Sequence, residues 1–130
     1  MEELQQCGAE GIITNSYIIY KNSELKRKAE QEGVHAMLGW ERPIMTDSGT
    51  FQSHVYGEIE MEPDVILDFQ KKIGVDIGTV LDVFTEPGTR FEEAKKELDE
   101  TQKRIEKADK NKKGMMLATP VQGGRYRDLR

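Results

Sequence analysis

Hydrophobic positions along the chain form short apolar runs, each followed by a polar or glycine-containing loop and then by an amphipathic charged segment. The runs are Gly11–Ile13, Pro43–Met45, Ile77–Leu81 and Met115–Ala118. They recur at intervals of about 30 to 40 residues, the size of one βαβ unit. Strands joined by helices at this spacing are parallel. The pattern therefore predicts an α/β fold of about four consecutive parallel βα units.

Capping residues and apolar stripes predict the helices between these strands. Ser23 stands where an N-cap is expected, and Thr89 with Glu92 has the spacing of a capping box. Pro63 suits the first turn of a helix because its missing N–H would be unpaired there. The expected helices cover residues 3–9, 24–32, 63–73 and 91–110, and a further one begins near Arg125.

The number of strands bounds the architecture. A closed (β/α)8 barrel needs eight strands and about 250 residues, whereas this chain has 130 residues and four predicted strands. The sheet is therefore either a compact open sheet or part of a barrel, and residues 1–130 form a single domain.

Composition narrows the classes of function. The net charge of −5 argues against a protein that holds nucleic acid by its phosphates, and the arginines of residues 124–130 are interpreted as a solvated end. With one cysteine and two histidines, the chain has no internal disulfide and no structural zinc site, and Cys7 is expected to be buried in the first helix. No apolar run of about 18 residues is present, and the N-terminal residues lack the features of a signal peptide. We therefore expect a cytoplasmic protein that does not bind membranes.

Polar side chains follow all four predicted strands, beginning with Thr14-Asn-Ser-Tyr17 after the first. Asp47 follows the second strand, Asp82 the third, and Gln122 with Gly123 the fourth. Each has an ordinary structural explanation, such as a turn, a helix cap or a positive φ. However, the carboxyl ends of parallel strands meet at one edge, where α/β folds carry their chemistry. Their joint location therefore indicates a functional site.

The motifs at these strand ends resemble a known family. The segment Pro43-Ile-Met-Thr-Asp-Ser-Gly-Thr-Phe-Gln52 is similar to the Asp-Ser-Gly-x-Phe-Gln signature of tRNA-guanine transglycosylases. Further segments resemble successive blocks of the archaeal, archaeosine-forming branch: Val55–Glu58, Phe69–Gly78, Leu81–Asp82 and Pro120–Gly123. The resemblance implies a (β/α)8 TIM barrel, of which this chain is the N-terminal half. It also implies an activity in which 7-cyano-7-deazaguanine replaces a guanine of tRNA.

The resemblance implies that five residues bind the base. A carboxylate at Asp82 accepts from the ring N–H and the exocyclic amine of a guanine-type base. The amide N–H of Gln122 and the backbone N–H of Gly123 point to the ring carbonyl. Phe51 offers a face for stacking, worth about 1 to 3 kcal/mol, and Ser48 is either a base contact or a turn former.

The resemblance also implies the catalytic roles. Asp47 is the candidate general acid/base. The nucleophilic aspartate, the zinc-binding cluster and the RNA-binding domains of the family belong to regions beyond this half. The chain alone is therefore expected to be inactive, to need no cofactor of its own, and to meet tRNA mainly through those other regions.

Three alternatives remain open. A half-barrel exposes unpaired strand edges and an apolar interior, so the chain could be a non-catalytic subunit, remnant or scaffold that associates with the missing half or with itself. A queuosine-type transglycosylase is less favoured, because Thr50 and the segment after Leu81 depart from the bacterial pattern. The third alternative is an unrelated α/β enzyme that acts on a phosphorylated ligand. The sequence has no glycine-rich phosphate loop that would support it.

Overall fold

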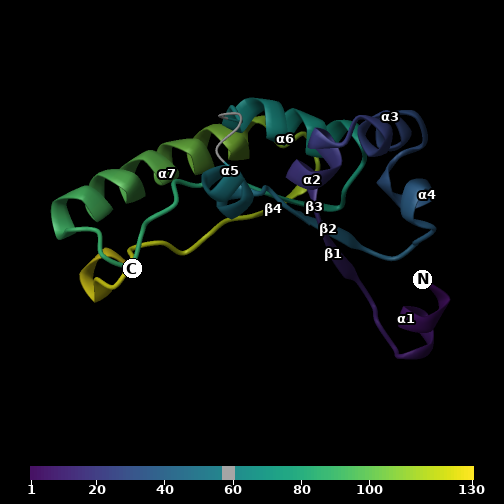
Figure 1. The fold of residues 1–130 in the computed structure, drawn as a ribbon, viewed down its shortest axis with the longest axis horizontal. Helices are drawn as coiled ribbons and strands as arrows, with labels where there is room; N and C mark the ends of the chain where they lie inside the picture. Colours follow the sequence, from purple (N-terminus) through teal and green to yellow (C-terminus); the bar gives the residue numbers. More distant parts are fainter. Residues whose placement is uncertain (57–60) are drawn as a thin grey trace.

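A parallel four-stranded sheet is the centre of the molecule (Figure 1). The computed structural model describes residues 1–56 and 61–130, so Gly57 and Glu58 of one family-like segment lie outside the described residues. The sheet has the order β1-β2-β3-β4, and every neighbouring pair is parallel. The strands are β1 (Ile12–Asn15), β2 (Ile44–Asp47), β3 (Ile77–Thr79) and β4 (Met116–Ala118). The predicted strands and their parallel order are confirmed.

Helices connect the strands, and most of their length was predicted. They are α1 (Glu2–Gln6), α2 (Ser16–Lys21), α3 (Ser23–Glu32), α4 (Val34–Leu38), α5 (Thr50–Tyr56), α6 (Pro63–Lys72) and α7 (Phe91–Asn111). The short helices α2, α4 and α5 were not predicted, because five to seven residues are too few for a clear period of 3.6. The expected helix near Arg125 is wrong, since the structure has only a 3-10 turn at Arg127–Leu129.

The N-caps of two predicted helices lie one residue from the expected positions. Asn22, not Ser23, caps α3, and its side chain accepts from the N–H groups of Glu24 and Leu25. The capping box predicted at Thr89 is wrong as well. Arg90 is the N-cap of α7, and its side chain makes no capping hydrogen bond. Arg90 keeps extended backbone angles, so the helix begins later than the Thr-x-x-Glu spacing indicates.

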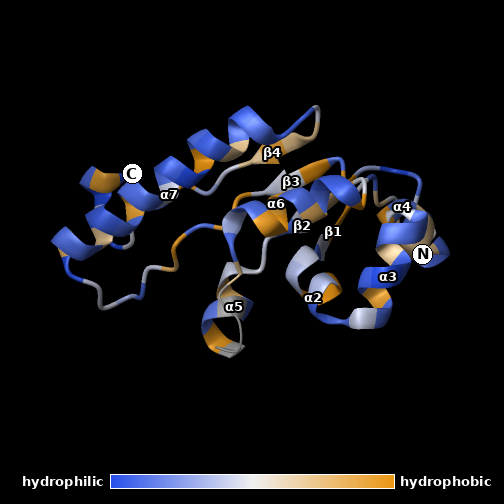
Figure 2. Cartoon of the chain, turned by 90° about the horizontal axis from the view of Figure 1, so that it is seen from above, coloured by the Kyte–Doolittle hydropathy of each residue, from blue (hydrophilic) through white to orange (hydrophobic). Residues whose placement is uncertain are grey.

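The hydrophobic core lies between one face of the sheet and the helices. Figure 1 shows α2, α6 and α7 together on one side of the strands. Trp40, Ile44, Ile66 and Ile73 are fully buried there. Figure 2 shows that most residues of α3 and α7 are hydrophilic. The predicted amphipathic helices thus bury one face each against the sheet or its neighbours.

One expectation about burial is wrong. Cys7 is exposed, because α1 ends at Gln6 and has no buried residue. The apolar residues of α6 and its C-cap are buried at Ile66, Phe69 and Ile73, together with the polar Gln70, whereas Val65 is exposed.

The opposite face of the sheet carries an apolar row across all four strands. Ile13 pairs in register with Met45, Met45 with Ile77, and Ile77 with Met116. At the two ends of the row, Ile13 is 64% and Met116 65% exposed. Helices on one face and an apolar row on the other are what an arc of a (β/α)8 wall has, since barrel interiors are filled by such layers. The sheet is therefore a partial α/β barrel.

Candidate active site

Asp47 is the last residue of β2. Its Oδ2 accepts a hydrogen bond of 2.8 Å from Nδ2 of Asn15, the residue paired with it on β1. Oδ1 of the same Asn15 accepts from the N–H of Ile18 and so caps α2. The backbone carbonyl of Asp47 accepts from the hydroxyl of buried Ser16 at 2.7 Å. The carboxylate is therefore held by the neighbouring strand end.

Sequence analysis missed Asn15 as a site residue. The available signal was its position, because Asn15 follows an apolar strand as Asp47 does. Asparagine is also a strong N-cap, so its amide can serve a helix and a carboxylate at once.

The turn after β2 is tightly packed. Ser48 is 2% exposed, and its hydroxyl donates to the carbonyl of Val80 at 3.1 Å, which ties this turn to the segment after β3. Gly49 has φ +85°, and a Cβ there would lie 2.2 Å from Cβ of Tyr17. Only glycine fits this position without displacing a buried tyrosine. A contact of Ser48 with a base stays a prediction.

Phe51 lies in α5, and 56% of it is exposed. Its ring contacts Phe84 edge-on, with 5.7 Å between centroids. His54 lies 4.6 Å from the same Phe84 ring and 3.4 Å from the carboxylate of Glu86. These contacts join α5 to the loop that follows Asp82, and the exposed part of Phe51 leaves a ring surface open to a ligand.

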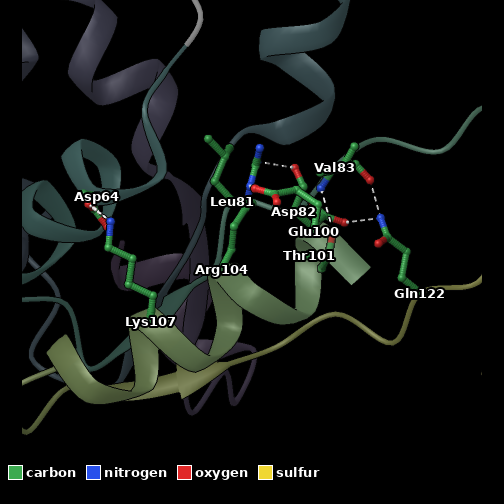
Figure 3. A network of polar contacts seen from close by, with 9 residues as sticks. All are labelled: Asp64, Leu81, Asp82, Val83, Glu100, Thr101, Arg104, Lys107 and Gln122. Atoms are coloured by element: carbon green, nitrogen blue, oxygen red, sulfur yellow. Dashed lines mark hydrogen bonds and ion pairs between the residues drawn. The ribbon is translucent and has the colours of Figure 1, made fainter. Parts of the chain in front are cut away.

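Asp82 and Gln122 contact each other across the ends of β3 and β4 (Figure 3). Nε2 of Gln122 donates to Oδ2 of Asp82 at 3.2 Å and also to the carbonyl of Val83. Since both partners are acceptors, the amide nitrogen must face them. Oε1 of Gln122 is buried and has no partner among the described residues.

An open hollow of about 580 Å³ lies at this edge of the sheet. Asp82, Gln122 and Gly123 line it, together with residues from the loops after β3 and β4. Gly123 has φ +140°, and a Cβ there would lie 3.0 Å from Cγ of Arg130. Three of the five predicted base-binding residues thus share one concave surface.

Side chains of α7 hold the backbone beside Asp82 (Figure 3). Nη1 of Arg104 donates to the carbonyls of Leu81 and Asp82, at 3.2 and 3.4 Å. Oγ1 of buried Thr101 accepts from the N–H of Val83 at 2.9 Å. Nε of Arg104 donates to Glu100 at 3.1 Å, so this i,i+4 ion pair of α7 also reaches the site.

A second hollow, of about 340 Å³, lies between α6 and α7. At its rim, Lys107 of α7 donates to the carboxylate of Asp64 of α6. This hydrogen bond and the charge of Asp64 raise the pKa of the Lys107 ammonium above its usual value, and desolvation acts in the opposite direction. Figure 3 shows the pair on the far side of Arg104 from Gln122, so it links two helices away from the predicted site.

The six predicted site residues come from three neighbouring strand ends. Asp82, Gln122 and Gly123 share the hollow, Ser48 is bonded to the segment before Asp82, and Phe51 contacts the loop after it through Phe84. Asp47 lies on the adjacent strand, turned toward Asn15. The arrangement offers two carboxylates, an amide, backbone donors and an aromatic ring, which suits recognition of a planar base with several hydrogen-bonding groups.

Neither a metal cluster nor a membrane span is found in the part of the chain that the structure describes. Within residues 1–56 and 61–130, no three or more His, Cys, Asp or Glu side chains gather in a way that could hold a metal ion. His35 instead pairs with Asp76 at 3.0 Å. Across the same residues, no helix is long and apolar enough to cross a bilayer.

Comparison with known proteins agrees with the motifs. Residues 1–130 match the family described as queuine tRNA-ribosyltransferase. The chain is 52% identical over 129 residues to the tRNA-guanine(15) transglycosylase of Thermoplasma acidophilum, covering 99% of this chain and 20% of that protein. For the enzyme of the same name from Methanosarcina acetivorans the identity is 49% over 130 residues, with 99% and 26% covered. The chain spans about a fifth to a quarter of the length of these relatives. It belongs to the queuine tRNA-ribosyltransferase family, the tRNA-guanine transglycosylases that its motifs indicate.

Proposed function

We propose that this chain is the base-recognition part of a tRNA-guanine transglycosylase that exchanges a guanine of tRNA for 7-cyano-7-deazaguanine. The observation that carries the proposal is the hollow lined by Asp82, Gln122 and Gly123 at the carboxyl edge of the sheet. A carboxylate there accepts from the ring N–H and amine of a guanine-type base. Phe51, exposed nearby on α5, supplies a stacking surface.

The contacts of Gln122 refine its proposed role. Its Nε2 is engaged by Asp82 and Val83, whereas Oε1 is buried without a partner among the described residues. A base that binds Asp82 with its donor edge therefore competes with Nε2 for Oδ2. The amide is then released to donate to the ring carbonyl, the role that the family resemblance implies.

The proposed exchange proceeds by covalent catalysis. A carboxylate from the remainder of the enzyme attacks the anomeric carbon through an oxocarbenium-like state, and the bond between that carbon and the guanine ring nitrogen breaks. The departing guanine takes up a proton, with Asp47 as the general acid. The incoming base gives up its proton, attacks the same carbon and displaces the carboxylate. Asp47 serves both proton transfers because a carboxyl group can donate and then accept.

We also propose what the rest of the enzyme contributes. The row from Ile13 to Met116, exposed at its two ends, is an apolar surface that further barrel strands cover when the barrel closes. These parts would supply the nucleophile, a zinc site and most of the contacts with tRNA. The chain's own negative charge of −5 supports the last point.

Incorporation of labelled guanine into tRNA tests the proposal. The chain is assayed alone, mixed with the remaining part of the Thermoplasma acidophilum relative, and as a chimera in which it replaces the matching segment of that enzyme. Activity is expected only in the mixture and the chimera. Activity of the chain alone would mean that Asp47 or Asp82 is the nucleophile. A folded chimera without activity would refute the proposed function.

Base specificity is tested in the same chimera. 7-Cyano-7-deazaguanine should displace labelled guanine from tRNA, and queuine should not. The Asp82→Ala variant should bind guanine more weakly by about 2 kcal/mol or more, because a bidentate bond to a charged group is lost. Unchanged affinity in this variant would contradict the base-binding assignment, and displacement by queuine would favour the queuosine-type alternative.

A further inference from the structure

The segment that carries Asp82 has no strand partners. β3 ends at Thr79, and residues 80–86 have no regular secondary structure. Backbone N–H and C=O groups that leave a sheet must find other partners where water is excluded. From Leu81 to Val83, these partners are side chains, and α7 provides two of them.

Arg104 and Thr101 hold this backbone from one side. Nη1 of Arg104 donates to two successive carbonyls, those of Leu81 and Asp82, and Thr101 accepts from the N–H of Val83. Thr101 is fully buried, and 26% of the Arg104 side chain is exposed. The carbonyl before Asp82, its own carbonyl and the N–H of Val83 are therefore held by one helix.

Glu100 orients this arginine. Its carboxylate accepts from Nε of Arg104, which leaves Nη1 directed at the two carbonyls. Exposed ion pairs of this i,i+4 type contribute only a few tenths of a kcal/mol to helix stability. The ion pair is therefore too weak to be the main role of Arg104. The other end of this arginine contacts the backbone of Asp82, a predicted site residue.

We propose that Arg104 and Thr101 are positioning residues that set the direction of the Asp82 carboxylate toward the base. The inference rests on the proposed function, because it assigns these residues to the same base site. A carboxylate that pairs with two donors of a planar base must lie in the plane of that base. A backbone displacement of about 1 Å can cost about 100-fold in a reaction that depends on such alignment.

Substitutions in the active chimera test the positioning role. Arg104→Met removes the donors and keeps an apolar stem, whereas Arg104→Lys keeps a cation that can donate to both carbonyls. Thr101→Val removes the acceptor for Val83 at nearly constant volume, and Thr101→Ser keeps it. The matched control is Lys103→Met, which removes a positive charge from the adjacent exposed position of α7.

A kinetic signature separates positioning from general stability. Arg104→Met and Thr101→Val should raise KM for guanine about tenfold or more, with KM for tRNA unchanged. The Lys and Ser variants should stay within about threefold of the unsubstituted chimera, because they retain the donor or acceptor. Lys103→Met should match the unsubstituted chimera in both constants. Thermal unfolding of each variant is measured alongside.

Two results would overturn the inference. One is an unchanged KM for guanine in both Arg104→Met and Thr101→Val. The other is a loss that follows the unfolding temperature and raises KM for tRNA and guanine alike, as expected for a structural role only. Either result, in a chimera where Asp82→Ala still weakens guanine binding, would leave the proposed function standing.

Discussion

Gln70 joins helix α6 to the ends of two strands. Its side chain is fully buried. Oε1 accepts from the hydroxyl of Thr46 at 2.7 Å and from the N–H of Thr79 at 2.9 Å, and Nε2 donates to the carbonyl of Thr79 at 2.9 Å. Thr46 directly precedes Asp47, so this amide supports the strand end on which the candidate acid/base lies. The substitution Gln70→Leu removes all three bonds at similar volume.

The structure sets the size of the effect. Thr46 is fully buried, so its hydroxyl would lose its partner without access to water, at about 2 kcal/mol. Loss of the Gln70 bonds to the N–H and C=O of half-buried Thr79 would cost about 1 kcal/mol each. Burial of a leucine in place of an amide returns about 1 kcal/mol. We therefore expect Gln70→Leu to lower the free energy of unfolding by about 3 kcal/mol.

Urea unfolding of the 130-residue chain, followed by far-UV circular dichroism, measures this loss. With a slope of about 1.5 kcal/mol/M, the midpoint should fall by about 2 M. Adding Thr46→Val should recover about 1 kcal/mol, because the orphaned hydroxyl is then absent. The control Gln102→Leu, at an exposed position of α7, should stay within about 0.5 kcal/mol of the unsubstituted chain. A Gln70→Leu midpoint equal to that of the control would refute the reasoning.

Two further predictions concern the turn around Asp47. Asn15→Ala and Asn22→Ala each remove a helix cap and should each cost about 1 kcal/mol in urea unfolding. Of the two variants, only Asn15→Ala should also lower guanine exchange by the chimera, about tenfold, because Asn15 contacts the Asp47 carboxylate and Asn22 does not. Equal activities of the two variants would contradict this role of Asn15. Gly49→Ala should lower the unfolding free energy by about 3 kcal/mol or more, because the added Cβ would overlap Tyr17 and alanine is strained at a positive φ. A thermal midpoint within about 2 °C of that of the unsubstituted chain would refute this prediction.

Periodicity predicted the longer helices correctly but missed three short ones, α2, α4 and α5. α6 and α7 were predicted because ten or more residues show a clear apolar face. By contrast, α2 begins directly at the end of β1, and its Tyr-Ile-Ile-Tyr core favours a strand by local propensity. It is helical because Asn15 caps it and because Tyr17 and Ile19 are buried in the core. Tertiary contacts overrode the local preference there.

Spacing and residue type suffice to predict the parallel α/β architecture, the family and the strand ends that carry polar groups. Which of these groups contact one another depends on how the elements pack. Asn15 with Asp47, and Arg104 with the backbone of Asp82, are separated by 32 and 22 residues along the chain. Their contacts arise only when parallel strands align in register and α7 packs beside the end of β3. Local sequence encodes elements, whereas the direction of a functional side chain depends on hydrogen bonds from other elements.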